Sequence, residues 1–285
     1  MLFIVGLIVV IVSVLAGYMG TGGHMHVLWQ PFEFVIIFGA AIGGFIIANP
    51  KRVQAGTLKA LGKLLKGPKY TKASYIELLS VLYAVFKLAK TKGDLALESH
   101  VDKPEDSPIF RTFPGFLADR HAVEFLCDYL RLITLGTSNP HEIETVMDAE
   151  LEASHAENVA IAGALHTVAD GLPALGIVAA VLGVIHTMGS ITEPPEVLGH
   201  LIGGALVGTF SGVLAAYGVA GPIASSLEST FRAEFRYVEC IKVGVIAHMQ
   251  GYAPQVAVEI ARKTLEPRSR PSFSELEGVL QSVQT

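Results

Sequence analysis

Few residues of this sequence could carry an ion across a membrane, and they are missing where that chemistry would need them. Two long apolar runs, residues 171–191 and 198–221, contain no Asp or Glu, and His186 is the only titratable side chain inside the first. Asp170 directly precedes the first run. A protein that moved ions through these runs alone would be expected to place a carboxylate or polar ligands within them. If ions pass here, we expect the acid to come from a partner.

Other kinds of chemistry are poorly represented. The sequence lacks a nucleophile elbow, a phosphate-binding loop, a zinc motif and a dinucleotide fingerprint. Cys127 and Cys240 have no metal-ligand neighbours, and His24 and His26 are too few for a closed metal site. We therefore expect no enzymatic activity, no cofactor and no bound metal.

The two apolar runs are punctuated by small residues at helical spacing. Such stripes let helices approach closely, so we expect each run to pack against another membrane helix or to line a narrow passage. Ordinary helix packing without transport is the more common meaning of this pattern. The stripes consist of Gly176, Ala180, Gly183 and Thr187 in the first run, and of Gly204, Gly208, Gly212 and Ala216 in the second.

Composition places these runs in a membrane protein. Of the 285 residues, 51% are hydrophobic and only 16% are charged, and mean hydropathy is +0.49. Two further runs, residues 2–19 and 32–48, also reach the length of a spanning helix. The sequence thus predicts an all-α integral membrane protein with four transmembrane helices, in which a large helical cytoplasmic region extends from the third and fourth spans. Glu33, at the start of the second span, is expected at the membrane interface.

Basic residues set the expected orientation. All 21 Lys and Arg lie between Lys51 and Arg131 or between Arg232 and Arg270. By the positive-inside rule these regions are cytoplasmic, both termini are cytoplasmic, and the two links without basic residues lie outside. Four regions follow. Residues 1–50 form two spans and a periplasmic link, 51–169 a cytoplasmic helical region, 170–222 the other two spans, and 223–285 cytoplasmic helices and a tail.

Several helices are expected in the cytoplasmic regions. The lysines of 51–66, including Lys66, predict a helix on the anionic membrane surface, with a second face of Leu58, Leu61, Leu64 and Leu65 and an end at Gly67-Pro68. Residues 74–89 predict an amphipathic helix that buries Ile76, Leu79, Tyr83, Phe86 and Leu88, and residues 90–98 are interpreted as a solvated loop.

Prolines punctuate the rest of the chain. Prolines across 104–115 interrupt regular structure before a helix over 119–135. Ser138-Asn139-Pro140 is a strong helix start, and no breaker follows before Asp170-Gly171, so this helix is expected to be nearly continuous with the third span. The fourth span could likewise continue past Pro222 to residue 249. Pro173 and Pro222 near one membrane depth, beside Asp170, suggest a hinge.

These residues also form a recognisable pattern. Asp170-Gly171-Leu172-Pro173-Ala174-Leu175-Gly176-Ile177-Val178-Ala179-Ala180, the run Val207-Gly208-Thr209-Phe210-Ser211-Gly212, and Ala220-Gly221-Pro222 resemble the MotA family of flagellar motor stator proteins. Asp128-Tyr129-Leu130-Arg131-Leu132, Gly251-Tyr252-Ala253-Pro254 and Arg270-Pro271-Ser272-Phe273 extend the resemblance along nearly the whole chain. The family belongs to the MotA/TolQ/ExbB proton channel superfamily and resides in the bacterial inner membrane.

The resemblance implies partners. It implies a homo-oligomeric ring, a pentamer, around a dimer of MotB, whose aspartate carries the ion, and contact with the rotor protein FliG. Such a complex turns the ion gradient into torque. Membrane lipid is a further expected contact, and nucleic acid is not a partner.

The resemblance also implies roles for single residues. Pro173 and Pro222, beside Asp170, would couple ion passage to movement, and Thr209 and Tyr217 would lie on the channel side. Glu98 would engage the rotor, with Lys90 at the position of its basic partner; many relatives have arginine there. Glu150 matches an acidic position near the cytoplasmic face.

One residue bears on the choice of ion. Sodium-driven relatives have a threonine at the position of Ala180, whose methyl group cannot replace a sodium ligand, so the proton is the expected coupling ion. Two alternatives to a stator remain. One is an energiser of an outer-membrane system resembling ExbB or TolQ, which would differ in span number and orientation, and the other is a channel or transporter that works without a partner.

Overall fold

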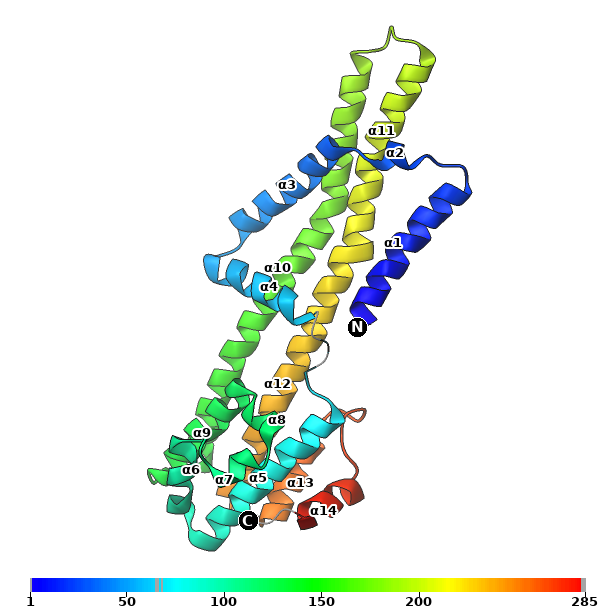
Figure 1. Cartoon of the computed structure of the whole chain (residues 1–285). Coiled ribbons are helices and arrows are strands. Elements are labelled where there is room, and N and C mark those ends of the chain that lie inside the picture. Colours follow the sequence, from blue (N-terminus) through cyan, green and yellow to red (C-terminus); the bar gives the residue numbers. More distant parts are fainter. Residues whose placement is uncertain (1, 65–66, 68, 283–285) are drawn as a thin grey trace. The chain divides into compact units, whose positions relative to one another are not determined.

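The computed structural model describes residues 2–64, 67 and 69–282, and it divides into two compact units. The membrane unit comprises Met1–Gly67 and Glu157–Thr230, and the globular unit comprises Pro68–Ala156 and Phe231–Thr285. Across the described residues all regular structure is helical, with no β-strand (Figure 1). The predicted all-α class is therefore confirmed.

Four helical segments are long and apolar enough to cross a membrane, as predicted. The short helix α2 (Met25–Leu28) lies in the link between the first two. The third segment ends at Met188, and the fourth begins at Pro195 and runs without interruption through a π-helix, η2, into α12. The segments are α1 (Leu2–Gly20), α3 (Pro31–Ala48), α10 (Pro140–Met188), and α11 (Pro195–Val213) with η2 (Leu214–Ala220) and α12 (Gly221–Met249).

The start of α10 has the helix cap that the sequence predicts. The side-chain oxygen of Asn139 accepts a hydrogen bond from the backbone N–H of His141 at 3.1 Å, and its amide donates to Glu142 Oε1 at 2.8 Å. Pro140 occupies the first helical position, where no N–H is needed. The helix then continues for 49 residues, past Asp170. The predicted continuity between the acidic helix and the third span is confirmed.

Helix α4 (Lys51–Leu64) forms within the predicted range and packs through one face. Its buried residues are Val53, Thr57, Ala60 and Leu64, at steps of four, three and four. Leu64 is buried and Leu58 is 74% exposed, so the predicted leucine face toward the membrane surface stays a prediction. The packed face makes a close contact at a small residue, because a Cβ built at Gly56 would lie 2.6 Å from Cδ1 of Ile161 on α10. Leu65, Lys66 and Pro68 lie outside the described residues.

An ion pair also joins α4 to α10. The guanidinium of Arg52 donates through Nε to Glu157 Oε1 at 2.9 Å and through its second nitrogen to Glu157 Oε2. Because the Arg52 side chain is 78% exposed, this fork orients α4 more than it stabilises the unit.

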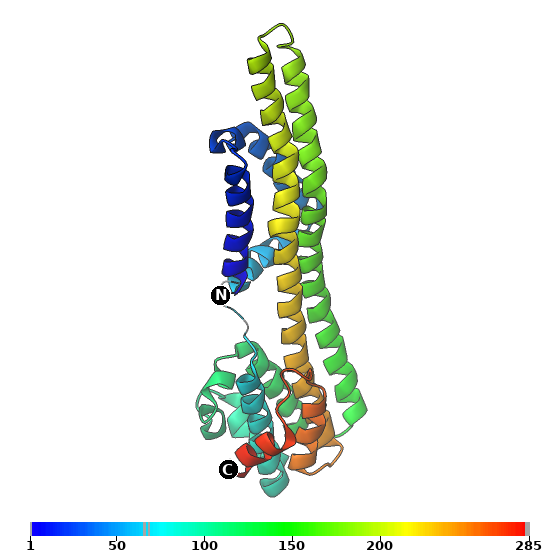
Figure 2. The same cartoon turned by 90° about the vertical axis from the view of Figure 1, so that its right-hand side faces the viewer.

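The globular unit is organised around α5 (Lys72–Lys92). The five consecutive residues from Leu78 to Leu82 are all buried, which covers every side of a helical turn. The predicted helix is present, and Leu79, Phe86 and Leu88 are buried as predicted. Ile76 and Tyr83 are only half-buried, and burial is not confined to one face. Helix α5 contacts α8 (Pro114–Leu117), α13 (Pro254–Lys263) and α14 (Phe273–Ser282) (Figure 2). Helix α5 is therefore buried on several sides, and a periodic pattern with one apolar face does not describe its burial.

The segment after α5 is more regular than predicted. Gly93 has φ of 84°, a conformation that favours glycine, and ends α5. A 3-10 turn, η1 (Asp94–Leu97), and α6 (Glu98–Asp102) follow it, so the interpretation of residues 90–98 as a loop is wrong for most of its length. Short α7 (Pro108–Arg111) and α8 each begin at a proline, as the interruption predicted across 104–115 suggests.

Asp119 fixes the start of α9 (Arg120–Thr134). Its side chain is 6% exposed and accepts a hydrogen bond from Tyr70 Oη at 2.8 Å. Asp119 also pairs with Lys69 Nζ at 2.8 Å and caps α9 at the N–H of Ala122. Tyr70 in turn stacks on Tyr237 of α12, with ring centroids 4.1 Å apart. One buried carboxylate thus ties the start of the unit to α9.

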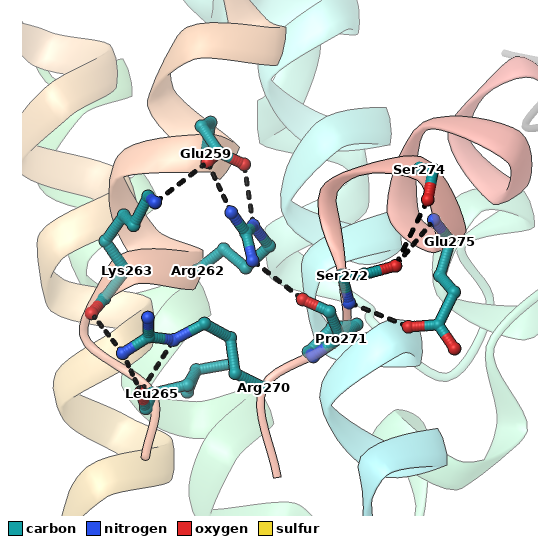
Figure 3. Close-up of polar contacts among 9 residues, drawn as sticks. All are labelled: Glu259, Arg262, Lys263, Leu265, Arg270, Pro271, Ser272, Ser274 and Glu275. Atoms are coloured by element: carbon teal, nitrogen blue, oxygen red, sulfur yellow. Dashed lines mark hydrogen bonds and ion pairs between the residues drawn. The ribbon is translucent and has the colours of Figure 1, made fainter. Parts of the chain in front are cut away.

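Two arginines hold the connection between α13 and α14 (Figure 3). Arg262, 5% exposed, forks onto both oxygens of Glu259 and donates to the carbonyl oxygen of Pro271 at 2.7 Å. Arg270 donates to the carbonyl oxygen of Leu265 at 2.6 Å, near the free C-terminal end of α13. The motif at 270–273 is therefore a turn pinned by charge-assisted hydrogen bonds.

Candidate functional site

Helices α10 and α11 meet through their glycines. A Cβ built at Gly176 would lie 2.8 Å from the carbonyl oxygen of Gly208 and 3.1 Å from Cα of Gly212. A Cβ at Gly212 would lie 2.6 Å from the carbonyl oxygen of Leu172. The backbones are thus too close for any side chain, and the two predicted small-residue stripes pack against each other. Figure 1 shows the two helices α10 and α11 side by side.

Glu33 of α3 reaches into this helix pair. A Cβ at Gly183 would lie 3.1 Å from Glu33 Oε1, and a Cβ at Gly208 would lie 2.8 Å from Glu33 Oε2. The carboxylate therefore occupies space that the two glycines leave open. Oε2 is buried and has no hydrogen-bond partner among the described groups.

Glu33 is absent from the channel residues predicted from the sequence. The apolar runs 171–191 and 198–221 contain no Asp or Glu, but α3 supplies one to them from a residue 150 positions earlier than Gly183 along the chain. The available signal was an acid inside an apolar run, which is a functional indication by itself. The two apolar runs therefore have a carboxylate of the same chain beside them.

Two predicted channel residues lie beside Glu33. A Cβ at Gly208 would be 3.1 Å from the backbone nitrogen of Ala180, so Ala180 and Glu33 border the same point. Thr209 is the next residue of α11, is half-buried, and has its Cα 3.3 Å from a Cβ built at Gly176. The structure thus gathers Glu33, Ala180 and Thr209 along one helix interface.

Tyr217 is placed differently. Its side chain is 70% exposed and belongs to the π-helix η2, away from the packed glycine face. Asp170 is also exposed, on α10. Within this single chain neither residue joins the group around Glu33.

The two prolines have different local structures. Pro173 lies inside α10, which keeps its α-helical assignment around it. Pro222 is the second residue of α12 and directly follows the π turn of η2. Proline lacks an N–H and its ring crowds the carbonyl four residues earlier, which explains the wider turn before it. Pro222 therefore does not end the helix.

The residues predicted to contact a rotor are exposed in the globular unit. Lys90 is in the last turn of α5 and Glu98 is the first residue of α6, and η1 separates them. Glu150 is engaged within the unit, because its carboxylate accepts a hydrogen bond from Tyr129 Oη at 2.7 Å. Burial, with this contact, raises the pKa of Tyr129 well above its usual value. Within the described part of the chain, Glu150 thus has a side-chain hydrogen bond, whereas Lys90 and Glu98 have none.

A pocket beside Lys90 is lined by Asp94, Gly136 and His248. His248 stacks on Phe86, with ring centroids 4.7 Å apart, and its Nε2 lies 3.7 Å from Asp94 Oδ1. Burial lowers the pKa of His248, with Asp94 opposing the shift and Lys90 adding to it. Its Nδ1 is buried without a hydrogen-bond partner among the described groups.

Metal ligands do not gather in the described part of the chain, where no three His, Cys, Asp or Glu side chains could hold an ion. Cys127 and Cys240 are both buried, and burial raises the pKa of each thiol to about 12. Neither thiol is therefore suited to act as a nucleophile or ligand.

Comparison with known proteins agrees with this geometry. Residues 4–93 match the model of the Motility protein A N-terminal domain, and residues 118–240 match the MotA/TolQ/ExbB proton channel family. The chain is 45% identical over 284 residues to Motility protein A of Escherichia coli strain K12, covering 100% of this chain and 96% of that protein. This chain belongs to the Motility protein A family.

Other relatives support the assignment. Chemotaxis protein LafT of Vibrio parahaemolyticus is 33% identical, with 95% of each chain covered. The flagellar MotAB stator complex of Bacillus subtilis has a chain that matches with a TM-score of 0.73 at 25% identity, covering 96% of this chain and 98% of that one. A chain of C. jejuni MotAB, at 22% identity and a TM-score of 0.79 over 95% and 98%, shows the same fold.

The function follows at the level of the family. The chain is a stator protein of the bacterial flagellar motor and an inner-membrane protein with helices that can span the bilayer. The matching relatives are motility proteins, which favours this function over the ExbB-like or TolQ-like alternative. The family is one of channel subunits, not of enzymes.

Proposed function

We propose that this chain forms a pentameric ring around two copies of a MotB-like partner and conducts protons to drive a rotor. The proposal depends on one observation: the chain is 45% identical in sequence, over essentially its full length, to a motility protein. Its fold is also shared with MotAB complexes. Neither the ring nor the partner is present in a single chain, so both rest on this family likeness.

The partner's carboxylate is proposed as the main ion carrier. Around the packed glycines, α10 and α11 offer an outer surface of large apolar side chains, including Ile177, Val181, Leu182 and Leu206. In a membrane such a surface faces lipid or another apolar helix. A partner helix that brings an aspartate to the level of Ala180 and Thr209 would complete the pathway there.

Proton coupling is proposed from Ala180. Sodium binds through several oxygen ligands, and the methyl group of Ala180 supplies none. Thr209, on the facing helix, contributes a hydroxyl in this neighbourhood. A proton needs a single acceptor, so the site is better suited to it.

The orientation is also proposed. Both termini and the globular unit would be cytoplasmic, because every lysine and arginine lies on the corresponding side of the predicted spans. Reporter fusions at residues 24 and 285 test it, since an activity that requires the periplasm is expected only from the first.

The choice of ion is tested in cells that lack their own stator proteins and produce this chain with its partner. Rotation is expected to stop when the proton gradient is collapsed and to be unaffected by removing sodium. Rotation that requires sodium and survives loss of the proton gradient would overturn proton coupling.

Rotor contact is assigned to Lys90 and Glu98, which are exposed at the junction of α5 and α6. Lys90→Glu with Glu98→Lys is expected to reduce torque and to spare ion conduction, because neither side chain belongs to the membrane unit. Glu105→Lys, an exposed acid on the same unit, is the control. An equal loss of torque and conduction would contradict the assignment.

A further inference from the structure

Glu33 has a position that helix packing alone does not explain. Its two carboxylate oxygens point to Gly183 on one helix and to Gly208 on the other, in a slot where either glycine would need to shift for a methyl group. Leaving a buried polar atom without a hydrogen bond costs about 1–3 kcal/mol. An apolar side chain of similar size would avoid this cost, so the carboxyl group needs another reason.

Proton exchange supplies such a reason. Around the slot, the groups next to Glu33 are glycine backbone, Ala179, Ala180, Ala205 and the amide of Gln30, which lies 3.0 Å from a Cβ built at Gly204. None of these can take up and release a proton, whereas a carboxyl group can. Ionisable side chains within membrane spans are rare and mark ion pathways and proton relays.

The position of Glu33 in the sequence indicates which side of the membrane the slot is nearer to. It lies in the first turn of α3, directly after the link that carries no basic residue. Under the proposed orientation that link is outside, so Glu33 lies at the outer end of α3. It also borders the same point as Ala180, which is proposed to lie on the ion pathway.

We propose that Glu33 is a second proton-binding residue of the pathway, which takes up a proton from the outer side before the partner's carboxylate receives it. In the first step the Glu33 carboxylate gains an O–H bond from a hydronium ion or water chain. In the second step that bond breaks, the proton moves to the partner's carboxylate, and Glu33 returns to its ionised form. No electron transfer is involved. This inference rests on the proposed proton-driven function.

Glu33→Gln tests the inference, because it keeps the size and polarity of the side chain but cannot carry a proton. Motor speed would be measured at low load, where proton supply limits rotation, and torque near stall, where protons pass slowly and their supply is not limiting. We expect low-load speed to fall about tenfold, less than the roughly 10²–10⁴-fold contribution of a positioned proton-transfer group, because the partner's carboxylate still carries the proton. Stall torque should be retained, and Glu33→Asp should restore part of the speed.

Two controls separate this role from packing. Glu196→Gln alters an exposed carboxylate in the first turn of α11 and should leave speed unchanged. Dependence on external pH gives the second control, because removing an outer proton acceptor should change the pH profile of low-load speed. If Glu33→Gln matches wild type in speed and profile, or lowers low-load speed and stall torque in equal proportion, the inference is overturned.

Failure of the proposed function gives a different result. If the unaltered chain and its partner produce no rotation, or rotation that needs sodium, the proton-driven function fails before any variant is compared. If the unaltered chain rotates on the proton gradient and Glu33→Gln is without effect, only the inference about Glu33 fails.

Discussion

The membrane unit and the globular unit are packed in opposite ways. In the membrane unit the closest contacts join backbone to backbone at Gly176, Gly208 and Gly212. The globular unit instead buries large side chains completely, among them Phe86, Phe110 and Leu126. In water, burial of such side chains is the main source of stability, whereas lipid offers apolar groups no comparable gain. Close backbone approach therefore holds the membrane unit together, whereas buried large side chains hold the globular unit together.

The units also share one feature. Each contains one titratable side chain with a buried atom that makes no hydrogen bond among the described groups, Glu33 in the membrane unit and His248 in the globular unit. Other buried polar side chains, such as Asp119 and Arg262, are fully engaged. These two exceptions are where protonation is expected to matter most.

The packing contrast would be broken most strongly by Gly212→Ala. Its Cβ would lie 2.6 Å from the carbonyl oxygen of Leu172 and 2.8 Å from Cα of Gly176, so α10 and α11 must separate. We expect a destabilisation of about 3 kcal/mol, at the upper end for overpacking because backbone atoms cannot rotate away. Thermal unfolding of the detergent-solubilised protein measures it.

Gly199→Ala is the matched control on the same helix. A Cβ there would meet no other described atom within 4 Å, so stability should be unchanged or slightly improved by the better helix former. Equal losses in both variants would show that the helix pair is not held by close backbone contact.

The globular unit should respond instead to loss of a buried polar group. Asp119→Ala removes the cap of α9 and leaves Tyr70 Oη without its acceptor. We expect about 2 kcal/mol of destabilisation, from the cap and the unpaired hydroxyl together. Asp106→Ala, which removes an exposed ion pair with Arg111, should cost less than about 1 kcal/mol. Amide hydrogen exchange in α9 compares the two, and similar protection in both would contradict the role of Asp119.

The sequence predicted the membrane unit better than the globular unit. Span lengths and the glycine stripes depend on local composition, so α10, α11 and the close packing of each against another helix were correctly expected. Burial of α5 depends on α8, α13 and α14, which cover its several sides, and no periodicity within 74–89 records those neighbours. Glu33 was missed for a similar reason, because its slot is built by glycines of two distant helices. Contacts between segments that are far apart in the sequence cannot be predicted from the pattern of either segment alone.

Within the membrane unit, the two prolines allow a sharper comparison. Pro222→Ala restores a backbone donor, so η2 should become regular α-helix and stability should rise, by up to about 3 kcal/mol. Amide exchange over 214–220 should slow. Pro173→Ala should change exchange less, since α10 is already regular around it. If the π turn exists for coupling, torque should fall in Pro222→Ala although the protein is more stable. Unchanged exchange over 214–220 would show that Pro222 does not cause the π turn.

The smallest expected effect concerns pH and His248. Burial lowers its pKa below the ordinary value of about 6.5, so between that value and the lowered one the unfolded state binds more protons than the folded state. Stability should therefore be fully present above about pH 6.5 and fall as the pH drops through this window, because charging the ring disfavours its buried place against Phe86. Exchange over residues 239–249 at about pH 7.5 and 5.5, corrected for intrinsic rates, measures it. His248→Gln should remove the dependence, and His141→Gln, whose ring is 86% exposed, should not. A loss that persists in His248→Gln would assign the acid sensitivity to another group.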